Sequence, residues 1–491
     1  MTPLYRAQQI KTHEGPAAEA IGLSLYDLME RAGAAVLNHF RQQYPKPNRL
    51  LVLCGAGNNG GDGYVVARLA QQKGWNVQVA AWREPDALTG DARRAADAYR
   101  DAGGTVEPLS AVHIHSDDLV VDALWGTGLD RPLPDDVAAF IQRLNDSPAT
   151  VISVDIPSGL HADTGAVLGA AVRANLTISL VAYKVGLFTG QANDCTGILM
   201  LDDLGIGAEF TQRATTNLSL NDAPVPFPTR RARTAHKGHF GQVMVVGGHS
   251  GMAGAARMAG EACLRVGAGR VTVAVHPDSR LLTGAGCPEL MVHGIAHPEV
   301  LGSALDSMTH LLVGPGLGQD DWSEAMWHEA LRSGKPLLLD ADGLNWLARH
   351  PKQPLPMEFI GTPHPGEAAR LLKCSVADIE RDRFTALNEL CRVFGGVWVL
   401  KGAGTLIGNG QQCFVNTSGN PGMATGGMGD VLTGVIGGLW AQGLDALSAA
   451  RCGVYGHGWA ADQTAAEQGE RGLLATDPYP ALRRWINTSD S

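Results

Sequence analysis

Short apolar runs alternate along the chain with longer segments whose apolar residues recur at helical spacing. The first helical segment begins at Ser24, and Ser24 with Asp27 is expected to form a capping box at its start. Runs typical of buried strands then follow, and half of them end at glycine or an acidic residue. They span 50–54, 76–82, 119–122, 151–155 and 176–181 in the first half, and 241–247, 270–275, 310–314, 336–340 and 396–401 in the second. This alternation predicts an α/β protein with two doubly wound sheets.

The helical and strand patterns disappear between residues 217 and 233, where three prolines fall between Asn221 and Thr229. Such a segment is typical of a semi-rigid linker between domains. We therefore expect an N-terminal domain at 1–217, a linker at 218–233 and a C-terminal domain at 234–491. Each half is long enough to bury a core of its own.

Composition narrows the class of protein. Hydrophobic residues make up 45% and charged residues 18% of the chain, which is typical of a globular protein and not of a disordered one. A net charge of −10 argues against nucleic acid or an anionic membrane as the main partner. The eight cysteines form no C-x-x-C pair, and no apolar run reaches the ~20 residues that span a bilayer. We expect a cytoplasmic protein.

A glycine-rich segment, residues 55–63, lies between a predicted strand and a predicted helix at 64–73. It satisfies G-x-G-x-x-G, the pattern of dinucleotide-binding turns. The next strand does not end in the acidic residue of that fingerprint, so an ordinary NAD-dependent dehydrogenase is disfavoured. Asn58, Asn59 and Asp62 add amide and carboxylate groups that a plain glycine turn does not need.

Two further strands end in acidic residues, Asp122 and Asp155, and Ser158 follows the second. Lys184 follows a third strand. Because ligands bind beyond the carboxyl ends of parallel strands, we expect these side chains to face one crevice, although each acid alone could be a helix cap or a turn. The oxygen groups of Asn59, Asp122 and Ser158 would suit an alkali or alkaline-earth cation better than zinc.

The segment 420–430 is rich in glycine, precedes an apolar helical run and ends at Asp430. The unpaired N–H groups at a helix start bind anions, and glycine lets phosphate approach the backbone. Asp430 has the wrong charge to hold phosphate, so we interpret it as a base that deprotonates an attacking hydroxyl, the alternative being a helix cap. The chain contains no Walker motif. His364, three residues before Glu367 in a proline-bounded loop, could face a ligand or solvent.

These motifs resemble known families. The second half resembles the carbohydrate-kinase-like branch of the ribokinase-like superfamily, with Gly427-Met-Gly429-Asp430 as its G-x-G-D signature, 401–405 as its nucleotide loop and 362–367 as its substrate loop. Sugar kinases of the superfamily often have N-x-x-E where this chain has His364 and Glu367. The first half resembles the Rossmann-like YjeF N-terminal fold through the motifs around Asn58, Asp122 and Asp155. Fused in this order, the halves resemble the bacterial bifunctional NAD(P)H-hydrate repair enzymes.

The resemblance implies that the first domain interconverts the R and S epimers of NADH and NADPH hydrated at C6. The second domain would dehydrate the S epimer with ADP and magnesium. It further implies a homo-oligomer whose ligands are the hydrated cofactor and ADP. Asp155, with Lys184, would transfer protons during epimerisation, and Asp430 would act in dehydration.

The resemblance also implies the ligands of each site. Potassium would bind Asn59, Asp122 and Ser158. In the first domain the hydrated cofactor would contact Asn58, Asn59, Gly60, Gly61, Asp62, Gly126, Thr127, Gly128, Leu129, Asp130, Arg131, Pro132 and Asp155. In the second domain it would contact Ala255, Gly318, His364 and Asp430, and ADP would contact Lys401, Gly402, Ala403, Gly404, Thr405, Gly427, Met428 and Gly429.

Two other interpretations remain open from the sequence. The second half could be a kinase for a small alcohol such as a vitamin precursor, which would release a stable phosphoester. The first half could be a binding module without catalysis, although the presence of Asn59, Asp122, Asp155 and Ser158 together favours an active site.

Overall fold

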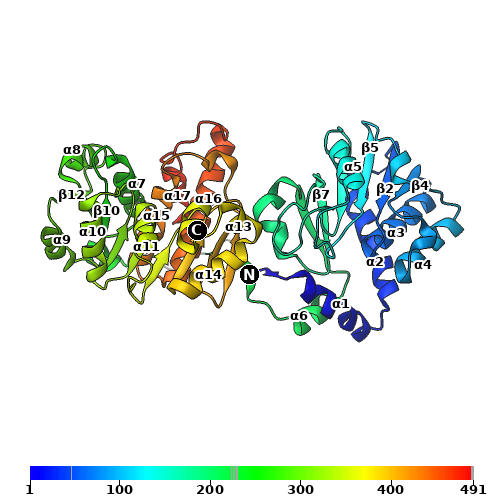
Figure 1. Ribbon diagram of the computed structural model, residues 1–491, viewed down its shortest axis with the longest axis horizontal. Coiled ribbons are helices and arrows are strands. Elements are labelled where there is room, and N and C mark those ends of the chain that lie inside the picture. The colour runs from blue at the N-terminus through cyan, green and yellow to red at the C-terminus, as the bar shows by residue number, and fades with distance from the viewer. Residues whose placement is uncertain (46, 223, 225–226, 228–229, 488–491) are drawn as a thin grey trace. The chain divides into compact units, whose positions relative to one another are not determined.

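The computed structural model describes residues 1–45, 47–222, 224, 227 and 230–487. The chain forms two compact units, one of Pro3–Leu218 and one of Met1–Thr2 with the residues from Ser219 on (Figure 1). Part of the predicted linker at 218–233 lies outside the described residues. Asn221, near its start, donates its backbone N–H to the Val415 carbonyl oxygen of the second unit, 2.8 Å away.

The first unit contains a parallel sheet with the strand order β4-β3-β2-β5-β6-β7-β8. Its strands are β2 (Arg49–Cys54), β3 (Val77–Ala81), β4 (Val106–Pro108), β5 (Asp118–Ala123), β6 (Thr150–Val154), β7 (Leu176–Leu180) and β8 (Ile198–Asp202). From β2 the chain proceeds to one edge through β3 and β4, and then returns to β5 on the other side of β2. The strand order therefore changes direction between β2 and β5, the place where open α/β sheets bind ligands.

Helices cover both faces of this sheet. They are α1 (Ala7–Ala20), α2 (Leu25–Arg41), α3 (Asn58–Gln72), α4 (Gly90–Asp101), α5 (Asp135–Asn145) and α6 (Gly207–Arg213). Side chains of α2 and α3 pack with Leu50 and Val52 in one core, whereas those of α5 pack with Leu51 and Leu53 in another. Successive residues of β2 thus face opposite sides, as in any strand.

The start of α3 differs from the prediction. We expected a loop through residue 63 and a helix from residue 64, but the helix begins at Asn58. Its glycines serve close packing inside the helix: a methyl group at Gly60 would lie 2.1 Å from the Gly55 carbonyl oxygen, and one at Gly63 would lie 2.8 Å from Cβ of Ala123. The capping box of Ser24 and Asp27 at the start of α2 is confirmed.

The second unit contains a larger sheet in which the order from β18 to β12 is β18-β17-β16-β15-β14-β13-β10-β11-β12. β16, β17 and β18 pair antiparallel, and the strands from β16 to β12 pair parallel. The strands of this unit are β10 (Gln242–Gly247), β11 (Arg270–Val275), β12 (Met291–Gly294), β13 (His310–Val313), β14 (Leu337–Leu339), β15 (Phe359–Gly361), β16 (Val397–Leu400), β17 (Thr405–Gly408) and β18 (Cys413–Asn416), and the short β9 (Leu218–Leu220) leads into it. The short β1 (Pro3–Leu4) belongs to the first unit. Here the order changes direction between β10 and β13.

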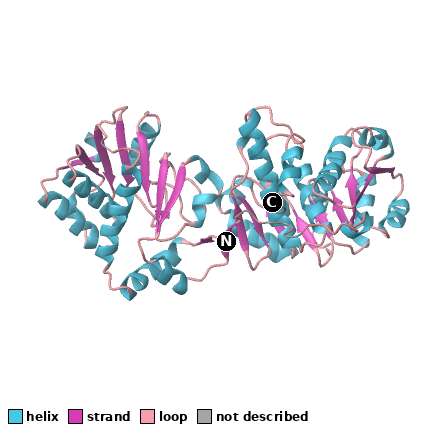
Figure 2. Cartoon of the chain, turned by 180° about the vertical axis from the view of Figure 1, so that it is seen from behind, coloured by secondary structure: helices cyan, strands magenta, loops and turns pink. Residues whose placement is uncertain are grey.

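Helices cover both faces of the second sheet as well (Figure 2). They are α7 (Ala253–Arg265), α8 (Arg280–Gly284), α9 (Pro298–Leu305), α10 (Asp321–Arg332), α11 (Asp342–Arg349), α12 (Pro365–Leu372), α13 (Val376–Arg381), α14 (Arg383–Phe394), α15 (Met428–Ala441), α16 (Ala446–Gln468) and α17 (Tyr479–Trp485). α7, α15 and α16 share one core with Val243 and Val245, and α10 contacts β10 and β13. α7 and α15 approach closely, because a methyl group at Gly434 would lie 2.1 Å from the Ala259 carbonyl oxygen.

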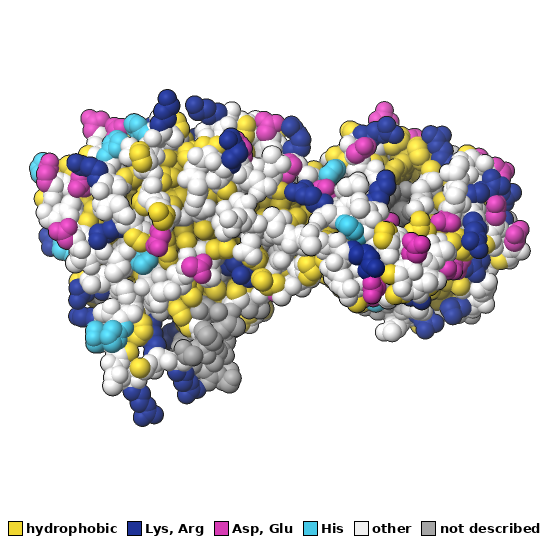
Figure 3. Space-filling view, turned by 90° about the horizontal axis from the view of Figure 1, so that it is seen from below, with side chains coloured by type: hydrophobic (Ala, Val, Ile, Leu, Met, Phe, Trp, Pro, Cys, Tyr) yellow, Lys and Arg dark blue, Asp and Glu magenta, His cyan; other side chains and the backbone are white. Residues whose placement is uncertain are grey.

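The distribution of surface charge and the lengths of the helices indicate which kinds of partner the protein could have. On the face drawn in Figure 3, basic and acidic side chains are interspersed over both units. Within the described residues, no helix combines the length and the apolar composition that crossing a membrane requires.

Candidate functional sites

A cavity of about 640 Å³ lies at the carboxyl ends of β2 and β5 in the first unit. The change in strand direction creates this space, because the loops after β2 and β5 leave the sheet toward opposite sides. Its walls contain many of the predicted site residues. They are Asn58, Asn59, Asp62, Gly126, Thr127, Gly128, Asp155 and Lys184.

Asp155 and Lys184 form an ion pair at this cavity. The Lys184 side chain is only 1% exposed, and its ammonium group also donates to the Leu180 carbonyl oxygen at 2.7 Å. Asp155 Oδ1 accepts a second hydrogen bond, from the Leu180 N–H at 2.9 Å. Asp155 has a φ of 66°, a left-handed conformation that is costly for a non-glycine residue and is enriched at functional sites. The pair can hold and move a proton at the cavity wall.

Glu14 of α1 is an acidic wall residue that we did not predict. Burial raises its pKa, and the Asp155 carboxylate raises it further. Burial also raises the pKa of Asp62 well above its usual value, with Asp155 and Glu14 adding to the rise. Burial and the negative charge of Asp155 thus raise the pKa of both Glu14 and Asp62. No local pattern around Glu14 distinguishes it from a surface helix residue.

Asp122, at the end of β5, is completely buried and surrounded by hydroxyl groups. Its carboxylate accepts hydrogen bonds from the Ser158 hydroxyl at 2.6 Å, the Ser158 N–H at 2.9 Å and the Ser153 hydroxyl at 2.8 Å. Burial raises the pKa of Asp122, although these hydrogen bonds oppose the rise. The buried Nδ2 atom of Asn59 has no hydrogen-bond partner. Rotation of this amide by 180° would place its carbonyl oxygen at the same position. The Asp122 carboxylate, the Ser158 hydroxyl and the Asn59 amide are a donor set that fits a monovalent cation.

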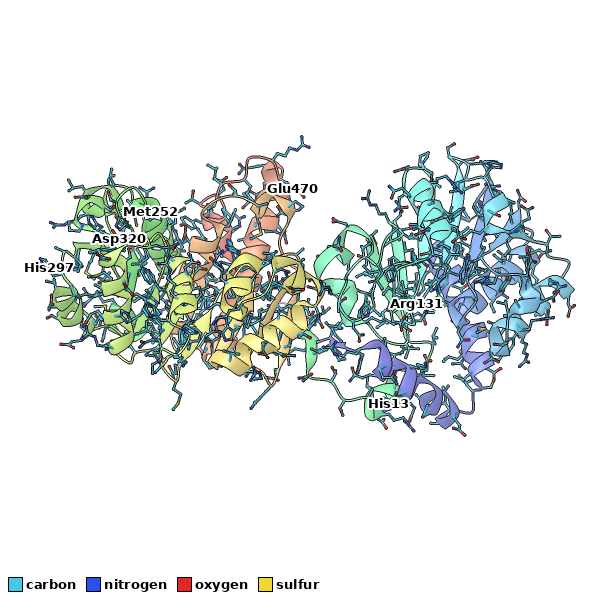
Figure 4. The ribbon with its side chains drawn as sticks, viewed as in Figure 1. His13, Arg131, Met252, His297, Asp320 and Glu470 are labelled. Carbon is cyan, nitrogen blue, oxygen red and sulfur yellow. The ribbon has the colours of Figure 1, made fainter. Side chains whose placement is uncertain are left out.

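Some predicted residues of the first domain do not line the cavity. Gly60 and Gly61 are buried in the first turns of α3, where they allow close packing. Leu129 belongs to the core beneath α5. Asp130, Arg131 and Pro132 are exposed, and Arg131 is labelled in Figure 4. A binding role for these residues stays a prediction.

Trp82 and Trp125 form an aromatic part of the cavity wall that the sequence did not indicate. Their ring centroids lie 4.7 Å apart with an interplanar angle of 50°. The two residues follow β3 and β5, which lie on either side of β2, so only the strand order brings them together. An aromatic surface of this kind can stack on a planar ring.

In the second unit, the predicted phosphate loop leads into α15 as expected. Gly427 precedes the helix with a φ of 93°, and Asp430 lies in the first turn, three positions after Gly427. Asp430 is therefore not the cap of this helix. Burial, with the negative charge of Asp340, raises the pKa of Asp430 to about 7. A carboxyl group with this pKa can accept a proton near neutral pH.

Asp340, directly after β14, is the centre of a buried polar network that we did not predict as a site. Its carboxylate accepts hydrogen bonds from the Lys401 ammonium group at 2.8 Å and from the hydroxyls of Thr362 and Thr433, each at 2.9 Å. Burial alone would lower the pKa of Lys401, but Asp340 and Glu367 outweigh it and raise the pKa. Lys401 Nζ lies 3.8 Å from Glu367 Oε2. The network joins the ends of β14 and β16 to α15.

His364 is the N-cap residue of α12. Its Nδ1 accepts hydrogen bonds from the N–H groups of Gly366 at 3.0 Å and Glu367 at 3.4 Å. Glu367 returns a bond by accepting the His364 N–H at 2.8 Å. Burial, with the positive charges of Lys401 and Arg370, lowers the pKa of His364. The His364 side chain is half-exposed, and its Nε2 lies 3.3 Å from Glu367 Oε1.

The predicted nucleotide loop, residues 401–405, rests on the side chain of Arg383. This guanidinium is 1% exposed and donates to the carbonyl oxygens of Leu400 and Lys401, each at 3.1 Å. Gly402 has a φ of 134°, and a methyl group there would lie 3.0 Å from the guanidinium. Lys401 directs its ammonium group into the Asp340 network, so its backbone and that of Gly402 form the outer face of the loop.

Ala255 and Gly318 lie after β10 and β13, where the second sheet changes direction. The Gly318 N–H donates to Asp342 Oδ2 at 2.9 Å, which holds its loop against α11. His249 lies beside this loop, because a methyl group at Gly318 would be 3.1 Å from its Cγ. His249 also contacts Asp320, the cap of α10, which is labelled with Met252 in Figure 4. His249 is a further residue at this site that spacing alone did not indicate.

Comparisons with known proteins match each half of the chain to a family. A family model described as YjeF-related protein N-terminus matches residues 25–186, and one described as NAD(P)H-hydrate dehydratase matches residues 243–482. A ribokinase-like superfamily protein from Enterococcus faecalis covers 56% of this chain with 97% of its own length, at 29% identity and a TM-score of 0.52. The predicted fold class, two doubly wound α/β domains with a ribokinase-like second half, is confirmed.

Relatives with the full two-domain arrangement are similar over almost the whole chain. A bifunctional NAD(P)H-hydrate repair enzyme from Coxiella burnetii is 45% identical over 490 residues, which cover 99% of this chain and 100% of the relative. Its counterpart from Escherichia coli is 44% identical over 486 residues, which cover 99% and 94%. The resemblance noted from the motifs is thereby confirmed, and the chain belongs to the family of bifunctional NAD(P)H-hydrate repair enzymes.

Proposed function

We propose that this protein restores hydrated NADH and NADPH in two steps. The N-terminal domain, 1–217, interconverts the R and S epimers of the hydrate. The C-terminal domain, 234–491, dehydrates the S epimer at the expense of ADP, which becomes AMP and phosphate. The observation that carries this proposal is the position of Asp430, in the first turn of a helix whose preceding glycines suit a phosphate.

Dehydration needs a better leaving group than hydroxide, and phosphorylation supplies one. Asp430 accepts the proton of the C6 hydroxyl as that oxygen bonds to the β-phosphorus of ADP. The bond from this phosphorus to the bridging oxygen breaks, and AMP leaves with the electron pair. The N–H groups of Gly427, Met428 and Gly429 stabilise the charge on the transferred phosphoryl group. Magnesium arrives with the nucleotide as part of the substrate and neutralises its phosphate oxygens.

Phosphate then leaves C6 with the electrons of the carbon–oxygen bond, and the lone pair of the ring nitrogen assists this cleavage. Loss of a proton from C5 forms the ring double bond and gives the dihydropyridine. Ala255, Gly318 and His364 line the hydrate pocket, and the loop of residues 401–405 holds the nucleotide. The change in strand direction between β10 and β13 supports this placement of the pocket.

In the first domain, the hydrate occupies the cavity at the ends of β2 and β5, and Asp155 with Lys184 transfers the proton during epimerisation. Their ion pair at the cavity wall supports these roles. Asn59, Asp122 and Ser158 would hold a potassium ion. The ion would neutralise the buried Asp122 carboxylate. Asn59 would link it to the loop at Gly126, because a methyl group added at Gly126 would lie 3.3 Å from Asn59.

We further propose that the protein acts in the cytoplasm as a homo-oligomer, without nucleic acid or membrane partners. The interspersed surface charges on the face in Figure 3 and the net charge of −10 support the last point.

The experiment that tests the proposed function gives the purified protein a mixture of R and S hydrates with ADP or ATP. Recovery of reduced-nicotinamide absorbance is followed together with the products. Recovery of the whole mixture requires both activities. Recovery of only the S share would show that the first domain is inactive, and a stable phosphorylated hydrate would identify a kinase instead. The Lys184→Met variant should recover only the S share.

A further inference from the structure

Three potential metal ligands, Glu324, His328 and His350, gather on one side of the second unit. Glu324 and His328 lie one turn apart on α10, and His350 is the residue that ends α11. His350 Nε2 lies 2.9 Å from Glu324 Oε1, and His328 Nε2 lies 3.9 Å from the same oxygen. One ligand atom from each residue lies within 4.8 Å of the other two.

His350 is held in place by the packing of its ring. It stacks on Trp327, with centroids 5.6 Å apart at 29°, and on Trp346, with centroids 6.1 Å apart at 19°. Trp327 is completely buried and donates to the Gly343 carbonyl oxygen at 3.1 Å, so it joins α10 to α11. A fixed imidazole loses little side-chain freedom on binding an ion, because its orientation is already set before the ion arrives.

The ligand set suits a borderline-soft divalent cation. Zinc binds imidazole nitrogen and carboxylate oxygen at about 2.0–2.2 Å, so tetrahedral ligand atoms lie ~3.3 Å apart. The three atoms here approach that spacing, and small rotations of His328 and Glu324 would complete it. Their side chains are 36–40% exposed, which leaves the fourth position open to water.

We propose that Glu324, His328 and His350 form a binding site for Zn²⁺ that joins α10 to α11. None of these residues has a part in the nucleotide or hydrate sites proposed above. The two helices begin next to the hydrate loop, where Asp342 at the start of α11 accepts the Gly318 N–H. The ion therefore braces the pair of helices that supports this loop. The competing explanation is an ordinary ion pair between His350 and Glu324, which would need no metal.

Zinc titration of the full-length protein distinguishes these explanations. The protein is stripped with a chelator, the chelator is removed, and Zn²⁺ is titrated against a chromophoric competitor. We expect one zinc ion per chain at this site. His328→Gln and His350→Gln should each weaken it at least about tenfold, since even substitutions of residues that only orient a ligand cost 10- to 100-fold in metal affinity. Co²⁺ should give the visible spectrum of a four-coordinate nitrogen and oxygen site, and both variants should lose it.

The double variant His236→Gln/His239→Gln is the matched control. These two imidazoles also lie close together, with centroids 3.8 Å apart. Among the described residues, however, they belong to no group of three potential metal ligands. The control should keep the zinc affinity and the cobalt spectrum of the wild type. Thermal unfolding without metal checks that the variants fold. Equal zinc affinity in the wild type and both site variants would overturn the proposal, as would loss of binding only in the control.

Discussion

The Lys401 ammonium group lies 2.8 Å from the buried Asp340 carboxylate, and this pair adjoins the start of α15. A methyl group at Gly429 would lie 3.4 Å from Lys401 Nζ and 3.7 Å from Asp340 Oδ2. The second oxygen of Asp340 accepts the Thr433 hydroxyl, one turn after Asp430. Asp340 thus positions Lys401 and α15 together, and its negative charge contributes to the raised pKa of Asp430.

The variant Asp340→Asn tests this positioning role. In the wild type, kcat/KM for dehydration should rise with pH through about pH 7. Removing the negative charge should lower the pKa of Asp430, so this rise should occur at lower pH in the variant. Misplacement of Lys401 should also reduce the rate about 10- to 100-fold. Glu299→Gln, at an exposed acid on α9, is the control. A lower rate with an unshifted profile would mean that Asp340 has only a structural role.

Replacing Asp430 by Asn should remove the proposed base while it preserves the shape of the side chain. We expect dehydration of the S hydrate to fall by about 10²- to 10⁴-fold, the usual contribution of a positioned base. Conversion of the R hydrate to the S hydrate should continue at the wild-type rate, because Asp155 and Lys184 are unchanged. Chromatography of the two epimers measures both activities. Dehydration at a near-wild-type rate would contradict the assignment.

Although Asp430→Asn should lower the rate of dehydration, it should make the protein more stable at high pH. Folding raises the pKa of Asp430 from 3.8 to about 7. The contribution of this group to stability is therefore fully present below pH 3.8 and is lost as the pH rises through about 7. The neutral asparagine side chain that replaces the carboxyl group does not ionise. Asp430→Asn should therefore match the wild type at pH 4 and exceed it at pH 8 by about 1–2 kcal/mol, a discounted value for a shift of this size. Denaturant unfolding at both pH values measures the difference in stability. An equal loss of stability in the variant at pH 4 and pH 8 would refute this prediction.

The sequence predicted the sheets and the acids at their strand ends because each is a local pattern. Asp122 and Asp155 follow apolar runs, and Asp430 follows a glycine loop, so spacing was sufficient. It did not predict that α3 begins at Asn58, because glycines usually indicate a loop. Here tight packing against the Gly55 backbone selects glycine inside the helix.

The residues that the sequence missed depend on strand order. Asp340 meets Lys401 across 61 positions and Thr433 across 93, and no local pattern encodes either contact. Trp82 and Trp125 come together only because their strands lie on either side of β2. Contacts of this kind follow from the fold as a whole, so they were found only in the structure.

A potassium site at Asp122 would make the stability of the protein depend on the cation. Because the buried carboxylate is costly without a compensating charge, K⁺ should raise the temperature of thermal unfolding relative to tetramethylammonium at equal ionic strength. Asp122→Asn should abolish this difference, and it should reduce epimerisation more than dehydration. Asp117→Asn, at an exposed acid before β5, should respond to K⁺ as the wild type does. A wild type whose unfolding does not depend on the cation would exclude the site.

Arg383 should govern nucleotide binding without touching the nucleotide. Its guanidinium holds the carbonyl oxygens of Leu400 and Lys401, so it can fix the shape of the loop without contacting a ligand itself. Arg383→Lys keeps the charge but cannot hold both oxygens in one plane. We expect the KM for ADP to rise about tenfold, from the loss of one or two charge-assisted hydrogen bonds, while kcat changes less.

The matched control is Arg381→Lys, two residues away and 71% exposed, which should leave the KM for ADP unchanged. Epimerase activity and the KM for the hydrate show whether Arg383→Lys acts only on the nucleotide loop. A merely destabilised domain would lose both substrates together, and its thermal unfolding would occur at a lower temperature. An unchanged KM for ADP in Arg383→Lys would mean that the loop keeps its shape without the guanidinium. The tight contact at Gly402 argues against that outcome, because the backbone there is already fitted to the arginine.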